Sequence, residues 1–321
     1  MKRMDVELEP RSSQRRSPVD RHGIAVLLPC FNEEATIGAV IDDVRTACAE
    51  AEIVVFDNNS TDRSPTIAGG KNVRVVRVSR QGKGNVVRAM LKRVEADVYV
   101  MLDADGTYPA ARIRELIKPV LDGTSDMVVG ARLASHEAGA FRRFHHIGNR
   151  ILCKLISLIW GARLTDVLSG YRAFTAEVAR ILPIVSSGFE VETEMTVQAL
   201  FYNMSISEVD IEYRARPEGS VSKLRSYRDG FAIFLQVLHL LRAYKPLTFF
   251  GGLGLICFAI ALLLGLPASL IPDLSRPVIA GVLAETLILL GALLISTGLI
   301  LHTLNFRVKE LHSVITRRPG Q

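Results

Sequence analysis

Residues 97–105 read DVYVMLDAD, an apolar run that ends in two carboxylates two positions apart. The run predicts a buried strand, so Asp103 and Asp105 stand where that strand ends. One or two carboxylates, completed by substrate phosphates, are typical of a Mg²⁺ or Mn²⁺ site. A plain Asp-rich turn is the competing explanation. The position directly after an apolar strand favours the metal site.

Further strands and helices alternate along the first half of the chain. Strands are expected over 24–29, 52–57, 72–79 and 126–132, and helices over 33–48 and 84–96. This alternation predicts an α/β domain with a mostly parallel sheet flanked by helices. Ligands of such sheets bind beyond the carboxyl ends of the strands. Polar residues gather at those ends in this chain: Asn32, Glu33, Asp57, Asn58, Asn59, Asp103, Asp105 and Arg132.

Two loops at this edge have the residue types of nucleotide sites. Asp57 follows the run EIVVF, and its carboxylate can accept hydrogen bonds from the N–H groups of a nucleobase. The alternative is a strand-to-helix turn in which residues 60–62 cap a helix, and we expect both roles together. Residues 80–84 read RQGKG, where the glycines beside Lys83 suit a close approach to phosphate. No G-x-G-x-x-G follows a strand, which disfavours a nicotinamide dehydrogenase.

These motifs, with PCFNEE at 29–34, resemble those of the family 2 glycosyltransferases of the GT-A (Rossmann-like) fold. DVLSGYR at 166–172 resembles D-x-x-S-G-[FY]-[RK] of the polyprenyl-phosphate glycosyltransferases, a group that includes dolichol-phosphate mannose synthase and bactoprenol glucosyltransferase. GAR at 130–132 is similar to the G-S-R of that group, and GFEVE at 188–192 and Arg216 with GSVSK at 219–223 also match. DADGTYP departs from the more frequent DADLQ[DN]P, which leaves the transferred sugar open.

The resemblance implies a role for each matching residue. Asp103 and Asp105 organise the metal, and the catalytic group comprises Asp105, Asp166 and Arg172. The nucleotide sugar is held by Pro29, Asn32, Glu33, Asp57, Lys83, Asp103, Arg216 and Lys223. The phosphate of the acceptor lipid is held by Arg132, Arg142, Arg143 and Ser169, with Arg172 as a further candidate. For Arg142 and Arg143 a cationic surface facing anionic lipid is an equally weighted alternative.

The expected chemistry limits what Asp166 has to do. A lipid phosphate is mostly dianionic near pH 7 and is already a nucleophile. It needs charge neutralisation more than a general base, because it must approach a second anionic group, the diphosphate. We therefore interpret Asp166 as orienting sugar hydroxyls or Arg172, more than as an obligate base. Displacement at the anomeric carbon is expected to be direct and inverting.

The C-terminal part is strongly apolar. The segment 247–271 contains no charged residue, and 277–306 contains only Glu285. Each is long enough to cross a bilayer, which predicts two transmembrane helices at about 247–271 and 278–304, within 246–306. The preceding segment 225–245 has cationic ends around an apolar middle and is expected to lie as an amphipathic helix in the interface. A similar stretch at 138–163 fits either an interfacial or a core helix.

Charge places the expected domains relative to the membrane. The tail 307–321 is basic, which puts it in the cytoplasm by the positive-inside rule. Two spans then place the glycosyltransferase domain, 23–224, on the same side. Residues 1–22 form a polar tail without the apolar core of a signal peptide. A multi-pass protein of the plasma (inner) membrane is expected, with its catalytic domain and both termini cytoplasmic.

The predicted activity is inverting, metal-dependent transfer of a sugar from a nucleoside-diphosphate sugar to a polyprenyl phosphate such as undecaprenyl phosphate. UDP-glucose is the first choice of donor and GDP-mannose the alternative. A processive polysaccharide synthase is disfavoured because the only tryptophan, Trp160, does not lie in a QxxRW motif. A non-catalytic membrane subunit is the alternative of another class, and intact Asp103, Asp105 and Lys83 argue against it.

Net charge and cysteine spacing limit the cofactors and partners that the chain is expected to have. The chain of 321 residues has a formal net charge of +6 and four cysteines. The cysteines form no C-x-x-C pair, so neither a zinc site nor a disulfide framework is expected. Mg²⁺ or Mn²⁺ is the expected cofactor. The expected partners are the nucleotide sugar, the lipid and the membrane, with a homo-oligomer possible and no nucleic acid.

Overall fold

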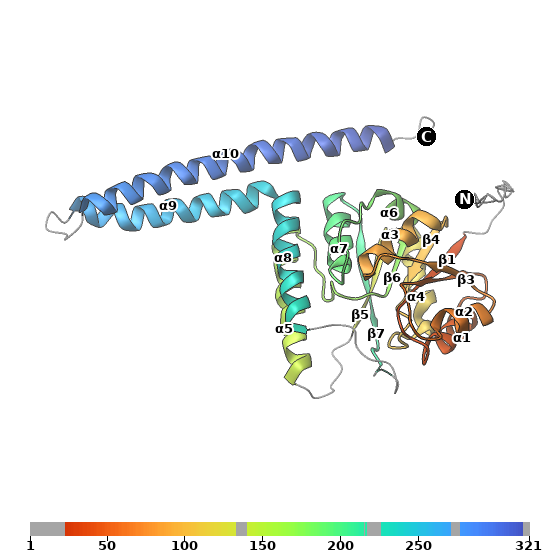
Figure 1. The fold of residues 1–321 in the computed structure, drawn as a ribbon. Helices are drawn as coiled ribbons and strands as arrows, with labels where there is room; N and C mark the ends of the chain where they lie inside the picture. Colours follow the sequence, from red (N-terminus) through yellow and green to blue (C-terminus); the bar gives the residue numbers. More distant parts are fainter. Residues whose placement is uncertain (1–22, 133–139, 215, 217–225, 271–276, 317–321) are drawn as a thin grey trace, which may run out of the picture.

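The computed structural model describes residues 23–132, 140–214, 216, 226–270 and 277–316. A domain built around one sheet is followed by a pair of long apolar helices (Figure 1). The strands are β1 (Ile24–Cys30), β2 (Glu52–Asp57), β3 (Arg74–Arg77), β4 (Val98–Met101), β5 (Met127–Arg132), β6 (Arg172–Thr175) and β7 (Ile206–Ile211). The helices of the sheet domain are α1 (Ile37–Ala47), α2 (Ser64–Gly70), α3 (Lys83–Arg93), α4 (Ile113–Leu121), α6 (Ala176–Ile181) and α7 (Val191–Phe201).

The seven strands have the order β3-β2-β1-β4-β6-β5-β7. Neighbouring strands are parallel except around β6, which runs antiparallel to both β4 and β5. The mostly parallel sheet expected from the sequence is confirmed. The strands β6 and β7 were missing from the sequence-based prediction. β6 is only four residues long and begins with an arginine, and β7 has mostly half-buried side chains, so neither gives a clear apolar run.

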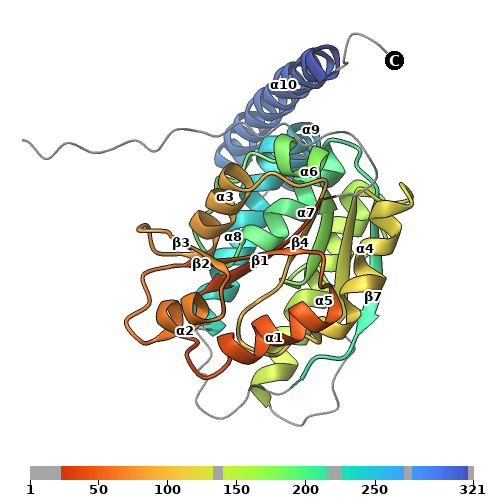
Figure 2. The same ribbon diagram turned by 90° about the vertical axis from the view of Figure 1, so that its right-hand side faces the viewer.

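Helices cover both faces of the sheet, as the end view shows (Figure 2). On one face α1 and α4 pack against the strands through side chains such as Ile41 and Leu116. On the other face α3, α6 and α7 do so through side chains such as Met90, Val178 and Met195. Burial of these apolar faces stabilises the sheet and leaves the carboxyl ends of β1, β2 and β4 free to carry a site.

Helices α5 (Ala140–Trp160) and α8 (Ser226–Tyr244) run side by side at the edge of the sheet domain (Figure 1). They pack against α7 in a separate apolar cluster that includes Ile156, Val197 and Val237. Other apolar side chains of the same helices are exposed, among them Leu158 and Phe234. The two helices therefore have one apolar face inside the protein and apolar side chains outside it.

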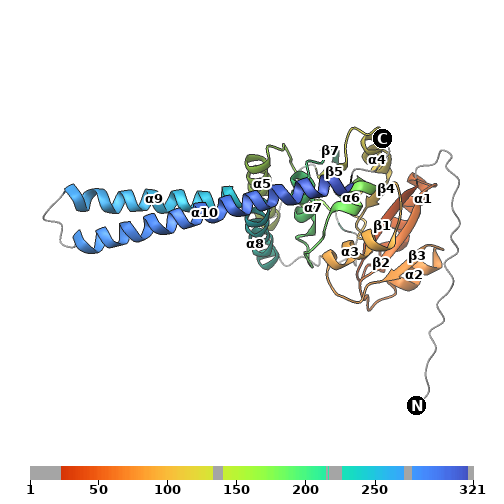
Figure 3. The ribbon, with the colours of Figure 1, turned by 90° about the horizontal axis from the view of Figure 1, so that it is seen from above.

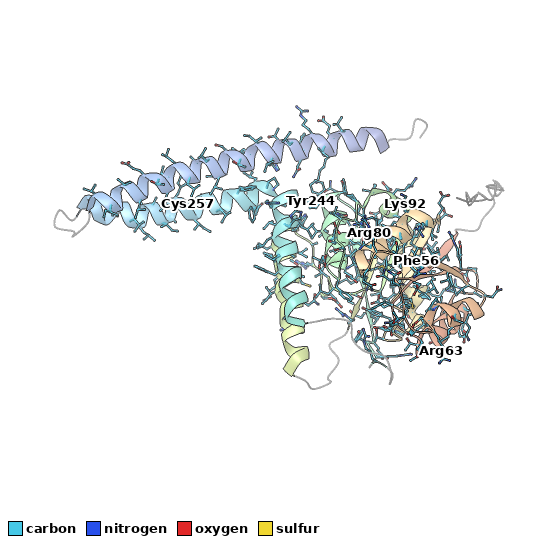
Figure 4. The ribbon with its side chains drawn as sticks, in the orientation of Figure 1. Phe56, Arg63, Arg80, Lys92, Tyr244 and Cys257 are labelled. Atoms are coloured by element: carbon cyan, nitrogen blue, oxygen red, sulfur yellow. The ribbon has the colours of Figure 1, made fainter. Side chains whose placement is uncertain are left out.

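The last two helices, α9 (Pro246–Leu270) and α10 (Pro277–Thr316), form a hairpin that extends away from the sheet domain (Figure 3). The windows Pro246–Leu266 and Val278–Leu311 are long and apolar enough to cross a membrane, and little of either is buried within the protein. The helices approach closely at two glycines: a Cβ on Gly254 would lie 2.7 Å from the carbonyl oxygen of Gly291. Figure 4 shows Cys257 on this hairpin, far from Phe56 in the sheet, with Tyr244 at the junction.

Candidate active site

A pocket of about 260 Å³ opens at the carboxyl ends of β1, β2 and β4, and we call it the strand-end pocket. The loops after these strands meet the first turn of α3 and the segment before α7 there. Its lining includes Pro29, Glu33, Asn58, Gln81, Gly82, Lys83, Asp103, Asp105, Phe189 and Arg216. The structure thus brings together residues from distant parts of the chain that were chosen from sequence.

Both carboxylates of the DAD motif contact cations. The ammonium of Lys83 lies 2.6 Å from Oδ1 of Asp103. The guanidinium of Arg216 lies 2.6 Å from Oδ2 of Asp105, whose Oδ1 accepts hydrogen bonds from the N–H and hydroxyl of Thr107. Asp105 is almost fully buried. Lys83 and Arg216 therefore balance part of the negative charge that the carboxylates bring to the pocket.

The donor set of this pocket fits Mg²⁺ or Mn²⁺ bound together with a diphosphate. Asp103 and Asp105 supply hard carboxylate oxygens, which such ions prefer. Within the described part of the chain, no group of three or more His, Cys, Asp or Glu side chains gathers to hold a metal. Phosphate oxygens and water would therefore have to complete the coordination, as is usual for Mg²⁺.

The loop that carries Lys83 is shaped by close backbone contacts. Gly82 has a φ of 121°, and a Cβ at this position would lie 2.1 Å from the carbonyl oxygen of Ser187. That carbonyl accepts a hydrogen bond from the N–H of Gly84. Only glycine fits such a backbone contact. The glycines of RQGKG thus let the loop pack against the segment before α7.

Asn58 also holds this loop, a role that the sequence analysis missed. Its side-chain amide donates to the carbonyl oxygens of Val78 and Arg80, at 3.0 and 2.7 Å. Its Oδ1 accepts a hydrogen bond from the N–H of Gly82 at 2.7 Å. Asn58 follows Asp57 directly after β2, and its place in a strand-end polar cluster was the available signal.

Asn32 and Asp57 shape loops beside the strand-end pocket and are not among the residues that line it. Oδ1 of Asn32 accepts a hydrogen bond from the N–H of Thr61, which joins the loops after β1 and β2. Oδ1 of Asp57 accepts from the N–H of Ser60 at 3.1 Å. The turn expected after β2 is therefore present, and contact of Asp57 with a nucleobase stays a prediction.

A second, larger hollow of about 610 Å³ lies between the end of β5 and α5, and we call it the cationic groove. Its lining includes Ala131, Arg132, Asn149, Arg150, Cys153, Lys154, Thr165 and Asp210. Three of these side chains are cationic. Arg150 and Lys154 on α5 join Arg132 there, and the sequence analysis assigned neither of them a role.

Asp166 lies behind this groove and holds Arg132. Its carboxylate accepts from Nε and Nη2 of Arg132 at 2.6 and 2.9 Å, from the N–H of the same residue, and from Asn149 and the N–H of Leu168. Burial pushes the pKa of Asp166 upward, but the hydrogen bonds and charge of Arg132 outweigh it and lower the pKa. Such an acid is a poor proton acceptor. Its orienting role fits the structure, with Arg132 rather than Arg172 as the partner.

Arg172 and Ser169 lie inside the protein, away from both hollows. Arg172 is fully buried, and its guanidinium donates to the carbonyl oxygens of Ser169 and Val167 and to the hydroxyl of Thr196. Burial lowers its pKa. Ser169 donates to the carbonyl oxygen of Gly130 at 2.6 Å. Neither residue lines the strand-end pocket or the cationic groove, and their expected contact with an acceptor phosphate stays a prediction.

The rest of the DVLSGYR motif connects the two hollows. A Cβ on Gly170 would lie 2.7 Å from Oδ2 of Asp103 and 2.8 Å from Nζ of Lys83, so a side chain here would displace the ends of these two side chains. Its N–H donates to the hydroxyl of Tyr108 at 3.0 Å. The motif therefore reaches from Arg132, through Asp166, to the carboxylate pair.

Three predicted residues cannot be placed. Lys223 lies outside the described residues, and so do the side chains of Arg142 and Arg143. Their expected roles stay predictions.

Two buried glutamates of α7 lie behind the lining of the strand-end pocket. Oε1 of Glu192 lies 2.6 Å from Nζ of Lys83, on which Asp103 also converges. Glu194 accepts hydrogen bonds from the N–H groups of Val185 and Ser186 and so fixes the segment that packs on the Lys83 loop. Both stand in the first turn of α7, where the run GFEVETE places several acids together.

Comparison with known proteins agrees with this geometry. Residues 25–182 match the model of the family described as glycosyl transferase family 2. Glycosyltransferase AglJ of Haloferax volcanii is 36% identical over 281 residues, which cover 86% of this chain and 92% of that protein. The dolichyl-phosphate hexose transferase of the same organism is 31% identical over 211 residues, covering 65% of this chain and 90% of that protein.

Solved structures show the same fold. Glucosyl-3-phosphoglycerate synthase from Mycobacterium tuberculosis, in complex with Mn²⁺, UDP and glucosyl-3-phosphoglycerate, matches with a TM-score of 0.57 at 24% identity. The match covers 70% of this chain and 80% of that one. The sheet domain thus has the GT-A fold. The chain belongs to glycosyl transferase family 2 and is a glycosyltransferase.

Proposed function

We propose that this protein transfers a sugar from a nucleoside-diphosphate sugar to a polyprenyl phosphate, with Mg²⁺ or Mn²⁺ as cofactor. The observation that carries the proposal is the pairing of two hollows of opposite charge. The strand-end pocket contains the carboxylates of Asp103 and Asp105, and the cationic groove contains Arg132, Arg150 and Lys154. A relative that is 31% identical over 65% of this chain is named a dolichyl-phosphate hexose transferase, which supports a lipid phosphate as acceptor.

The strand-end pocket suits the donor. Asp103 and Asp105 would hold the divalent ion, which would supply positive charge to the diphosphate when bound. Lys83 and Arg216 place two further cations at the same pocket. UDP-glucose is our first choice of donor and GDP-mannose the alternative. A structural neighbour binds UDP and Mn²⁺ together, so the fold accommodates such a pair.

The cationic groove suits the acceptor. Asp166 holds the Arg132 guanidinium in a fixed orientation, and Arg132 can then meet a phosphate dianion with parallel N–H groups. The acceptor phosphate oxygen attacks the anomeric carbon, the bond from that carbon to the diphosphate breaks, and the nucleoside diphosphate leaves. No proton has to be removed from the dianion, so no general base is required. Direct displacement inverts the anomeric configuration.

The apolar hairpin gives such an enzyme access to its lipid. We propose that α9 and α10 cross the plasma membrane, with the sheet domain and both termini in the cytoplasm. The helices α5 and α8, which expose apolar side chains, would then lie at the membrane surface. Association of copies through these helices is a further part of the proposal.

The test is an assay of the purified full chain with undecaprenyl phosphate, Mg²⁺ or Mn²⁺, and a panel of UDP- and GDP-sugars. We expect a lipid-linked sugar from one donor, no product with EDTA, and no product from the Asp105→Ala variant. Failure of nucleotide binding would overturn the enzyme reading and favour the non-catalytic subunit. Product formation that persists in EDTA would overturn the metal requirement alone.

A further inference from the structure

One buried ammonium is shared by two carboxylates at the base of the strand-end pocket. Nζ of Lys83 lies 2.6 Å from Oδ1 of Asp103 and 2.6 Å from Oε1 of Glu192. Asp103 lines the pocket, whereas Glu192 stands behind Lys83 and is not part of the lining. Lys83 therefore links a residue that faces the ligand to one that does not.

Glu192 is poorly accommodated as a purely structural residue. It is only 3% exposed, and within the described part of the chain its buried Oε2 atom has no hydrogen-bond partner. Burying a charged oxygen without a partner costs folding free energy. A glutamine of the same shape would avoid the charge. The carboxylate is better explained by what it does for Lys83.

Glu192 also has a rigid support. It is the second residue of α7, and its own carbonyl oxygen accepts a hydrogen bond from the hydroxyl of Thr196. The same hydroxyl accepts a hydrogen bond from the buried guanidinium of Arg172. Arg172 therefore braces the first turn of α7, which fixes the position of the Glu192 carboxylate.

We propose that Glu192 is a positioning residue that keeps Lys83 in place when Asp103 turns from Lys83 to the divalent ion. Lys83 and the ion compete for the same carboxylate. With Glu192 as a second counter-ion, the ammonium stays neutralised while Asp103 binds the ion. Without it, metal binding must leave a buried ammonium unpaired or compete against a stronger Lys83–Asp103 pair. The inference rests on the proposed metal site at Asp103 and Asp105.

The test measures the binding of Mn²⁺ to the full chain in the presence of UDP. Electron paramagnetic resonance detects the bound ion, so the readout does not depend on catalytic turnover. Glu192→Gln keeps the shape and a hydrogen-bond acceptor but removes the charge. We expect the Mn²⁺ dissociation constant to rise about tenfold, a moderate effect for one charge of a buried ion pair. Glu192→Asp, which restores the charge, should recover most of the affinity.

Glu190→Gln is the matched control. Glu190 lies two residues earlier, is half-buried, and accepts a hydrogen bond from the N–H of Gly188, so its exchange should leave Mn²⁺ affinity unchanged. The melting temperature of each variant shows whether it is folded. A folded Glu192→Gln protein with wild-type Mn²⁺ affinity would overturn the inference while leaving the proposed function intact.

A double-mutant cycle tests whether Glu192 acts through Lys83. In a Lys83→Gln background the competing ammonium is gone, so Glu192→Gln should change the Mn²⁺ dissociation constant much less than it does alone. An equal factor in both backgrounds would mean that the charge acts on the ion directly, which contradicts the inference. Absence of Mn²⁺ binding by the unmodified protein would overturn the metal assignment and this inference together.

Discussion

The strand-end pocket and the cationic groove lie in the same sheet domain but have opposite charge. Carboxylates outnumber cations in the lining of the pocket, whose charged residues are Glu33, Lys83, Asp103, Asp105 and Arg216. Cations outnumber carboxylates in the groove, whose charged residues are Arg132, Arg150, Lys154 and Asp210. An excess of negative charge suits a divalent cation, and an excess of positive charge suits a phosphate dianion. The comparison assigns donor and acceptor to separate places.

Each hollow also neutralises part of its own charge. Arg216 and Lys83 contact the carboxylates of the pocket, and Asp166 contacts Arg132 at the groove. Charged ligands must therefore join existing ion pairs rather than fill a bare site. This arrangement limits the free-energy cost of keeping like charges together before ligands bind.

The largest effect is expected at the pocket. Asp105→Asn keeps the shape of the side chain but removes the charge that faces the ion, so kcat/KM for sugar transfer should fall about 10³-fold or more. Binding of Mn²⁺ with UDP should weaken in parallel. A variant with near-normal turnover and Mn²⁺ affinity would show that the negative charge of the pocket serves another purpose.

A substitution of Arg172 tests whether this residue stabilises the core or belongs to the cationic groove. Arg172→Lys keeps the charge, but an ammonium cannot reach Ser169, Val167 and Thr196 together as the guanidinium does. We expect the free energy of unfolding to fall by about 2 to 3 kcal/mol, because buried acceptors lose their donors. Chemical denaturation measures it. Wild-type stability combined with a higher KM for the lipid would instead assign Arg172 a role in binding the acceptor phosphate.

The fold was largely predictable from periodic apolar runs, and so were the residues that follow β1, β2 and β4. Asp103 and Lys83 lie in one pocket because parallel strands end at one edge, a rule that requires no coordinates. The burial of Arg172 was not predicted, because a motif gives the order of residues but not the direction of a side chain. Asp166 contacts Arg132, which lines the groove, whereas Arg172, six residues later on antiparallel β6, is fully buried.

Contacts between residues that are far apart in the sequence were the hardest to predict. Glu192 meets Lys83 only because α7 packs on the same face of the sheet as α3. Arg150 and Lys154 line the groove because α5 passes the end of β5. The GFEVE match drew attention to Glu192 in the sequence, whereas Arg150 and Lys154 look like ordinary residues of a helix surface. In all three cases only tertiary packing shows which residues they meet.

Arg132 gives the next largest effect, now on the groove side. Arg132→Ala removes the guanidinium that Asp166 holds and leaves that buried carboxylate without its main partner. We expect kcat/KM for the lipid phosphate to fall about 10²-fold, as for the loss of a charged phosphate contact. Donor binding, measured with UDP and Mn²⁺, should stay close to normal. An equal loss in both measurements would contradict the separation of the two sites.

Asp166→Asn should reduce activity less than Asp105→Asn or Arg132→Ala does. An asparagine still accepts one hydrogen bond from Arg132 but no longer fixes the guanidinium through two charged contacts. Activity should drop about tenfold, mainly through a higher KM for the lipid, if Asp166 orients Arg132. Because the carboxyl has a lowered pKa, the wild-type rate should not fall until the pH drops into the acidic range. Complete loss of activity in Asp166→Asn would favour the general base.

The smallest effect is expected in the reactivity of two buried thiols. Cys30 lines the strand-end pocket and Cys153 lines the cationic groove. Burial, aided by the nearby carboxylates of Asp57 and Glu33, raises the pKa of Cys30 to about 12, and burial raises the pKa of Cys153 in the groove to about 11. Below these values the thiols carry their protons, so neither should react appreciably with iodoacetamide at pH 8 in the folded protein. As the pH is raised, mass spectrometry should find Cys153 alkylated before Cys30, because burial and nearby carboxylates raise the pKa of Cys30 further. Unfolded protein, in which both thiols react alike, is the control. Rapid labelling of Cys30 at pH 8 would contradict the burial and the raised pKa of this thiol.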